Sequence, residues 1–180
     1  MVFEQNGIII NGELHVNGTQ QDSILFSHID QGEWQGIQFE YATGTSNISY
    51  ADIKHTTSHG IYSYYSQDIN IENTSITDFN DYAIYINDTF SEINLQNMFI
   101  EGGGSNTYIY AEDTYLFIDN LELNAEGASK GIDFVGTGSF EITNSNISGA
   151  NNEGIYISGA NYNHIIANCI FYRKHKKSYR

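Results

Sequence analysis

The chain repeats itself at intervals of 23 or 24 residues, and this period limits the folds that it can adopt. Three columns of apolar residues keep the interval. Self-similarity at this spacing is typical of stacked architectures, in which each repeat buries its apolar face only against its neighbours. The first column is Ile37, Ile61, Ile84, Tyr108, Ile132 and Ile155. The second is Ile48, Ile71, Leu95, Ile118, Ile142 and Ile166, and the third is Ile53, Ile76, Ile100, Leu123, Ile147 and Phe171.

Within each repeat, apolar residues lie two positions apart, as in Ile84/Ile86 and Ile69/Ile71. This alternation indicates short strands with one buried face, and the residue types are the β-branched and aromatic ones that suit a sheet. Gly, Asn, Asp and Ser bound the stretches and leave no room for a useful helix. Each repeat is therefore predicted to contain three short strands and three turns.

An asparagine follows the second apolar column by two residues in five repeats. A repeat that advances by one strand spacing, roughly 4.8 Å, stacks equivalent strands in parallel register. We expect the stacked amides to hydrogen-bond from coil to coil at a sharp bend, where polar groups would otherwise be buried. Asparagine also tolerates the left-handed backbone of such a bend. The predicted ladder is Asn73, Asn97, Asn120, Asn144 and Asn168.

These features resemble the right-handed parallel β-helix of the pectin-lyase-like superfamily, and most closely the general β-helix repeat segments of secreted and surface proteins. The resemblance is carried by the asparagine column and by Gly36-Ile37-Gln38-Phe39, Gly60-Ile61-Tyr62, Gly131-Ile132-Asp133-Phe134 and Gly154-Ile155-Tyr156-Ile157. It implies an all-β, right-handed, single-stranded parallel β-helix, a solenoid of about seven coils. A leucine-rich repeat would need an L-x-x-L-x-L run, and a left-handed hexapeptide helix would need a six-residue interval; neither occurs.

The length of 180 residues suits one domain. We expect residues 1–172 to form the β-helix, as a segment of a longer solenoid, and residues 173–180 to form a disordered basic tail. The single cysteine, Cys169, excludes an intramolecular disulfide. Cys169 follows the asparagine column directly, as Thr74 and Ser145 do, and is therefore interpreted as a small turn residue.

Charge is distributed unevenly along the chain. Five of the seven basic residues lie in the last eight positions, so the first 172 residues carry Lys54 and Lys130 against 22 acidic residues, a net charge of −20. Such a surface repels nucleic acid and anionic lipid. The chain starts without a basic segment followed by an apolar run, which indicates neither a signal peptide nor membrane insertion. We expect a segment of a larger extracellular or cell-surface protein.

The outward positions of the first predicted sheet include several aromatic residues. Tyrosine offers sugar rings a flat apolar face with a polar tip. The predicted carbohydrate-binding residues are Tyr62, Tyr85, Asp133 and Tyr156. Gln38 and Ile109 complete the same outward column. The alternative is that the stacked aromatics only stabilise the sheet surface.

Acidic residues recur in the turns at the repeat interval. Asp68 and Glu92, and likewise Asp88 and Glu112, are 24 residues apart, so each pair is expected to stack on neighbouring coils. Oxygen-rich clusters suit Ca²⁺, with Asp113 and Asn87 as further ligands. The alternative is a solvated acidic rim.

Catalytic signatures of the resembled superfamily are not visible. Its lyases use an arginine or lysine base beside Ca²⁺, whereas no arginine precedes Arg173 and the two lysines lie on different turns. His55, with Lys54 or His59, could act as an acid–base pair, although the sequence shows no group that would orient either imidazole. We predict a non-catalytic β-helical module that has a structural, adhesive or glycan-binding role. The alternative is a fragment of a polysaccharide lyase or glycoside hydrolase.

Overall fold

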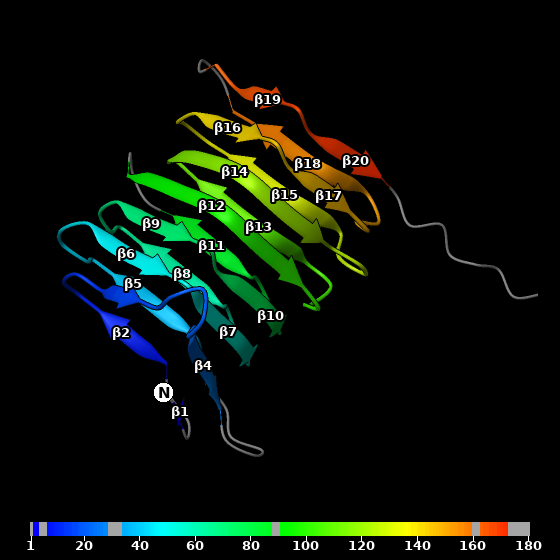
Figure 1. Ribbon diagram of the computed structural model, residues 1–180. Coiled ribbons are helices and arrows are strands. Elements are labelled where there is room, and N and C mark those ends of the chain that lie inside the picture. The colour runs from blue at the N-terminus through cyan, green and yellow to red at the C-terminus, as the bar shows by residue number, and fades with distance from the viewer. Residues whose placement is uncertain (1, 4–6, 29–33, 88–90, 160–162, 173–180) are drawn as a thin grey trace, which may run out of the picture.

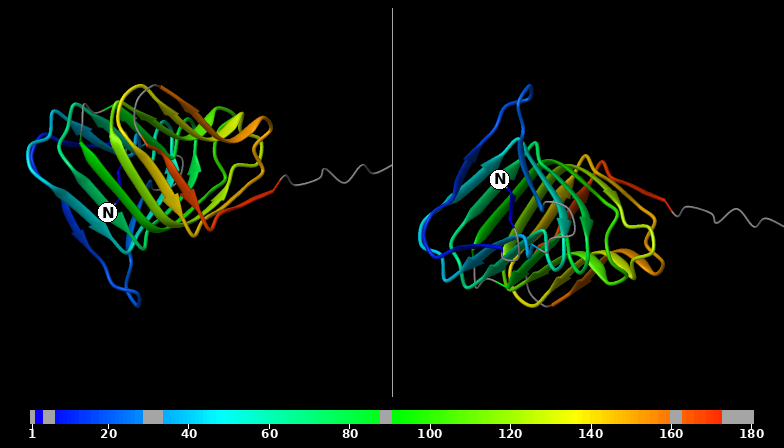
Figure 2. Two further views of the ribbon diagram at one scale, coloured as in Figure 1. Left: turned by 90° about the horizontal axis from the view of Figure 1, so that it is seen from above. Right: turned by 90° about the horizontal axis from the view of Figure 1, so that it is seen from below.

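The computed structural model describes residues 2–3, 7–28, 34–87, 91–159 and 163–172. These residues wind into a coil of short strands that pair in parallel from one turn of the chain to the next (Figure 1). Views from above and from below the stack show the turns following one another around a common interior (Figure 2). The predicted all-β parallel β-helix is confirmed, with about six turns instead of seven.

The strands form two sheets. The seven-stranded sheet has the order β18-β15-β13-β11-β8-β5-β2, with the bounds β2 (Ile8–Ile10), β5 (Ile37–Glu40), β8 (Ile61–Tyr64), β11 (Ile84–Asn87), β13 (Thr107–Glu112), β15 (Lys130–Val135) and β18 (Glu153–Ser158). The thirteen-stranded sheet contains β1 (Val2–Phe3), β3 (His15–Asn17), β4 (Ile24–His28), β6 (Ser46–Ser49), β7 (Ala51–Thr56), β9 (Ile69–Glu72), β10 (Ser75–Phe79), β12 (Glu92–Glu101), β14 (Tyr115–Asn124), β16 (Phe140–Thr143), β17 (Asn146–Ser148), β19 (Ile165–Ala167) and β20 (Ile170–Tyr172).

The thirteen-stranded sheet covers two sides of the coil. In most turns of the chain it contains two separate strands, such as β9 and β10, whereas β12 and β14 run continuously through the bend between the two sides. The prediction of three strands in each repeat is therefore confirmed in outline.

The interior is filled by the predicted apolar columns. Strand pairing places Ile71 between Ile48 and Leu95, and Ile76 between Ile53 and Ile100, as the second and third columns require. Most members of these columns are fully buried. Large rings complete the core, among them Trp34, Tyr108, Phe39, Phe134 and Phe140.

Each corner of the coil uses residues in the left-handed backbone region. All five asparagines of the predicted ladder have φ between +50° and +55°. The other two corners use the same conformation, for example at Tyr65 (φ +48°) and His55 (φ +57°). Asparagine and glycine adopt this region at the lowest cost. The recurring polar residues of the sequence therefore mark bends of the backbone.

One predicted position is wrong by a single residue. Ile109, and not Tyr108, pairs with Ile84 and Ile132 in the first column. The turn before β13 holds one residue more than a constant 24-residue interval allows, next to the Gly102–Gly104 run. A one-residue shift in a strand exchanges its two faces. Ile109 is thus fully buried, and Tyr110 points outward in its place.

Cys169 lies where the small polar turn residues of other coils lie. Its Sγ is 3.3 Å from the carbonyl oxygen of Ala167, as Ser145 Oγ is 2.7 Å from that of Thr143. The interpretation of Cys169 as a turn residue is consistent with these contacts. No helix in the described ranges is long and apolar enough to cross a membrane. The predicted tail, residues 173–180, lies outside the described residues.

Candidate functional site

The outward side of the seven-stranded sheet carries a group of aromatic side chains that we call the aromatic face. It is defined by His59, Tyr62, Tyr82, Tyr85 and Tyr110. Strands β8, β11 and β13 present one tyrosine each in register, because Tyr85 pairs with both Tyr62 and Tyr110. The column continues through Asp133 to Tyr156. All four predicted carbohydrate-binding residues therefore lie in one column, with Tyr110 as the member that the constant period had missed.

The tyrosine rings stack on one another. Ring centroids are 5.4 Å apart between Tyr62 and Tyr85 and 4.9 Å apart between Tyr85 and Tyr110, with interplanar angles of 15° in both pairs. His59 stacks against Tyr62 and Tyr85 at 5.4 and 5.5 Å. Such offset stacks stabilise the sheet surface. Because the ring faces are turned toward each other, ring edges and hydroxyl groups remain for contact with solvent.

Polar partners surround the stack. Asn106 Nδ2 donates to the hydroxyl of Tyr82 at 3.0 Å, and the hydroxyl of Tyr110 donates to Glu112 Oε2 at 3.0 Å. Burial raises the pKa of Tyr110, and the hydrogen bond to Glu112 and the charges of Glu112, Tyr85 and Asp133 raise it further. Burial and the nearby charge of Asp81 also raise the pKa of Tyr82. Both hydroxyls therefore stay protonated. The hydroxyl of Tyr82, which accepts from Asn106, can still donate a hydrogen bond to a ligand, whereas the hydroxyl of Tyr110 can only accept one, because its hydrogen is shared with Glu112.

His59 is held uncharged by the same environment. Burial lowers its pKa, and the opposing effect of Asp81, whose Oδ2 is 3.7 Å from His59 Nδ1, is smaller. That separation is too long for a hydrogen bond. A neutral imidazole can both donate and accept a hydrogen bond. His59 thus adds a polar edge to the face without adding charge.

The predicted asparagine ladder is present, with one interruption. Asn97 Nδ2 donates to Asn73 Oδ1 at 3.0 Å, and Asn120 Nδ2 donates to Asn97 Oδ1 at 2.8 Å. Asn144 instead donates to Asp119 Oδ1 at 2.7 Å, and the hydrogen bonds from Thr143 and Asn144 lower the pKa of Asp119. The ladder lies at the surface: Asn73 is half-buried, and the other four members are exposed. The amides point outward because the bend turns these side chains away from the core.

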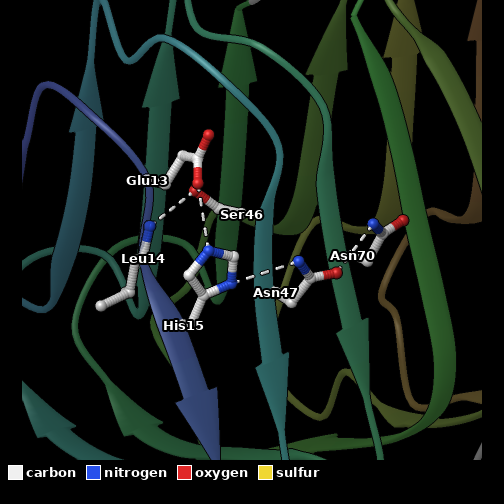
Figure 3. A network of polar contacts seen from close by, with 6 residues as sticks. All are labelled: Glu13, Leu14, His15, Ser46, Asn47 and Asn70. Atoms are coloured by element: carbon white, nitrogen blue, oxygen red, sulfur yellow. Dashed lines mark hydrogen bonds and ion pairs between the residues drawn. The ribbon is translucent and has the colours of Figure 1, made fainter.

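A second ladder runs along the outer surface of β3, β6, β9 and β12. Asn70 Nδ2 donates to Asn47 Oδ1 at 3.0 Å, and Asn94 Nδ2 donates to Asn70 Oδ1 at 2.9 Å. His15, which also contacts Glu13, continues this network on the preceding coil (Figure 3). The sequence carried a signal for it, since each asparagine directly precedes a member of the second apolar column. Its outward position makes it a surface element.

The carboxylates that were predicted to bind Ca²⁺ have partners within the protein. Asp68 Oδ1 accepts the backbone N–H of Glu92 at 2.8 Å, and Glu112 Oε2 accepts Asn87 Nδ2 at 3.0 Å. Asp113 Oδ1 accepts both the N–H and the hydroxyl of Thr137. Asp88 lies outside the described residues. Within the described ranges, no group of three or more His, Cys, Asp or Glu side chains is arranged to hold a metal ion. The structure therefore gives the calcium prediction no support.

Another cluster, which we call the histidine corner, consists of His28, His55 and Asp78. The rings of His28 and His55 lie 5.3 Å apart, and His55 Nε2 is 3.5 Å from Asp78 Oδ2. Ser27 Oγ lies 3.0 Å from His55 Nδ1, whereas His28 Nδ1 is buried without a hydrogen-bond partner. An open groove runs beside the cluster. No group that orients His55 could be identified from the sequence, because its partners Ser27 and Asp78 come from the coils on either side.

Comparison with known proteins supplies one match. A family model described as "Periplasmic copper-binding protein (NosD)" matches residues 16–177. No curated protein and no solved structure matches the chain. The matched range contains the aromatic face, the histidine corner and every strand from β4 to β20. Because the match spans most of the 180 residues, the chain belongs to the NosD family.

Proposed function

We propose that this protein is a non-catalytic β-helical module of an exported protein and that its aromatic face binds polysaccharide. The observation that carries the proposal is the concentration of half-exposed tyrosines, with a neutral histidine and amides, on one side of the seven-stranded sheet. Tyrosine hydroxyls and amides are suited to hydrogen-bond sugar hydroxyls. The periplasmic description of the family agrees with an exported location.

The geometry indicates how a glycan would lie. Ring faces in the stack already contact other rings, so the ligand would meet ring edges, hydroxyls and the side-chain amides of Gln38 and Asn106. Two further tyrosines extend the surface: Tyr41 and Tyr65 are 63% and 51% exposed, and their rings stack at 6.1 Å. Polar contacts along a preformed, rigid sheet favour binding, because the protein loses little conformational entropy on association.

Replacing the central tyrosine tests the proposal. Tyr85→Ala is expected to weaken retention on a bound polysaccharide by about tenfold, because one hydroxyl and the continuity of the stack are lost. Affinity electrophoresis through neutral and acidic polysaccharides measures retention, and an assay for unsaturated or reducing ends measures turnover. The matched control is Phe99→Ala, which removes a 38% exposed aromatic residue from the thirteen-stranded sheet.

The outcomes separate the candidate roles. Retention that Tyr85→Ala weakens and Phe99→Ala leaves unchanged supports the proposal. Release of sugar ends would support a polysaccharide lyase or hydrolase fragment instead. If no polysaccharide in the panel is retained, the aromatic stack has the structural role that the sequence left open.

Copper binding is a second candidate, favoured by the histidine corner. Imidazole is a ligand that suits copper. His28 and His55 bring two rings to 5.3 Å, and Ser27 orients His55 as outer partners of metal-bound histidines do. Among the described residues, no third His, Cys, Asp or Glu completes the pair, so the corner would offer copper two imidazole ligands. When bound, copper would supply a redox-active ion, held by these two side chains.

Titration with copper checks this candidate. The double variant His28→Ala/His55→Ala is expected to lower Cu²⁺ affinity at least tenfold in isothermal titration calorimetry, since both imidazole donors are lost. The control His15→Ala/His164→Ala removes two histidines that are distant from the corner in the fold. Equal affinities of the two double variants would assign copper binding to other groups.

A further inference from the structure

Asp133 is a buried acid at one end of the aromatic face. It lies on β15, between Tyr110 and Tyr156 in the outward column, and only 8% of its surface is exposed. Its Oδ2 forms an ion pair with Lys130, whereas its Oδ1 is buried and has no hydrogen-bond partner. A buried carboxylate oxygen without a hydrogen-bond donor destabilises the protein, because no hydrogen bond replaces those that the oxygen made with water. The position therefore favours an additional donor from outside the chain.

Lys130 shows which chemistry the position accepts. Its ammonium nitrogen contacts the Asp133 carboxylate and lies 3.9 Å from the centroid of the Tyr156 ring. A carboxylate beside the face of an aromatic ring is the combination that binds ammonium groups. In the ligand-free protein, Lys130 occupies this combination as an internal ammonium group.

The charges around the face favour the same ligand class. Asp81 and Glu112 lie beside the tyrosine stack. Burial raises the pKa values of Tyr82 and Tyr110, and the nearby charge of Asp133 raises them further. Among the described residues of the seven-stranded sheet, Lys130 is the only lysine or arginine, and it is already paired. A uronic acid polymer would find no free cation here. A ligand that carries ammonium groups would be attracted.

We propose that Asp133, Tyr110 and Tyr156 form a subsite for the ammonium group of an amino-bearing polysaccharide, and that Lys130 occupies this subsite until the ligand displaces it. The proposal rests on the proposed glycan-binding function and names its substrate class. The sugar chain lies along the column of tyrosines. Its amino group takes the place of the Lys130 ammonium at the Asp133 carboxylate, between Tyr110 and Tyr156 in that column.

Two variants are expected to act in opposite directions. Asp133→Asn should weaken binding of a glucosamine oligosaccharide at least tenfold, because the charged acceptor is lost. Lys130→Met should strengthen it by about fivefold, because the internal competitor is removed. Isothermal titration calorimetry at constant ionic strength measures both, and circular dichroism confirms that each variant is folded. The charge-matched controls on the other sheet, Glu122→Gln and Lys54→Met, should change affinity by less than about twofold.

A pair of ligands separates this proposal from the one that it rests on. The fully N-acetylated oligosaccharide has the same sugar backbone without the ammonium groups, and should bind at least tenfold more weakly than the amino form. If both forms bind equally and only Tyr85→Ala weakens them, the glycan-binding face stands and the ammonium subsite is wrong. Weaker binding by Lys130→Met would also overturn the subsite, as would tighter binding of a lysine-rich peptide than of the amino oligosaccharide. If neither oligosaccharide binds, the ammonium subsite is wrong, whereas the glycan-binding face is overturned only if the panel of neutral and acidic polysaccharides is not retained either.

Discussion

Phe134→Ala is expected to lower the free energy of unfolding by about 3 to 5 kcal/mol. Phe134 is fully buried on β15, with its ring 5.6 Å from the rings of Phe140 and His164. Removing the ring loses its transfer free energy and leaves a cavity that stacked strands cannot easily close, because each strand is held by hydrogen bonds to the coils on both sides. In a solenoid, such a defect weakens the contacts with both neighbouring repeats.

Urea denaturation followed by circular dichroism and by tyrosine fluorescence measures the loss. Coincidence of the two transitions tests whether unfolding is two-state. Phe117→Ala, an outward substitution of the same type on β14, provides the control, and should cost less than about 1 kcal/mol. A loss of similar size at both positions would mean that the interior is not the main source of stability.

Asn97→Ala is expected to lower the free energy of unfolding by about 2 to 3 kcal/mol. Asn97 has φ +53°, a conformation that alanine adopts only at a cost. Its side chain also donates to Asn73 and accepts from Asn120, at 3.0 and 2.8 Å. Asn97→Gly loses the same hydrogen bonds and keeps the backbone conformation, so its loss should be smaller by about 1 kcal/mol.

The second ladder provides the control for this prediction. Asn94 makes a similar hydrogen bond to Asn70, at 2.9 Å, and lies in the same strand, β12, but before the bend and without the left-handed conformation of Asn97. At this position the order should be reversed, with Asn94→Gly more damaging than Asn94→Ala, because glycine is unfavourable inside a strand. The same order at both positions would show that backbone conformation does not explain the asparagine column. Urea midpoints of the four variants decide the matter.

Much of the architecture could be predicted from spacing. Ile71 and Ile76 stack on the residues that the period assigns to them, and Asn97 adopts the conformation that its position indicates. The prediction failed at Tyr108, where one additional residue in a turn moved the register. Turn length is not encoded by strand alternation, so a constant period cannot detect such an insertion. The same failure removed Tyr110 from the predicted aromatic column.

The candidate sites show a similar division. Tyr62 and Tyr85 could be paired from the sequence because they occupy equivalent positions in adjacent repeats. The stacking of their rings on His59, and the ion pair that places Lys130 over Tyr156, depend on side-chain directions that the period does not specify. The histidine corner likewise joins residues of three coils, and its members share no sequence motif.

By itself, the sequence determined that the chain winds into parallel coils with an apolar interior, because a period of 23 or 24 residues and the alternation within it allow few other ways to bury those side chains. The tertiary structure alone decided which rings stack, which carboxylates receive hydrogen bonds and that the buried carboxylate oxygen Asp133 Oδ1 is left without a donor. Burial is repeated in every coil and is therefore visible as a pattern. The contacts of Asp133 and of the histidine corner form once, between particular atoms of neighbouring coils, and depend on distances that only the folded chain establishes.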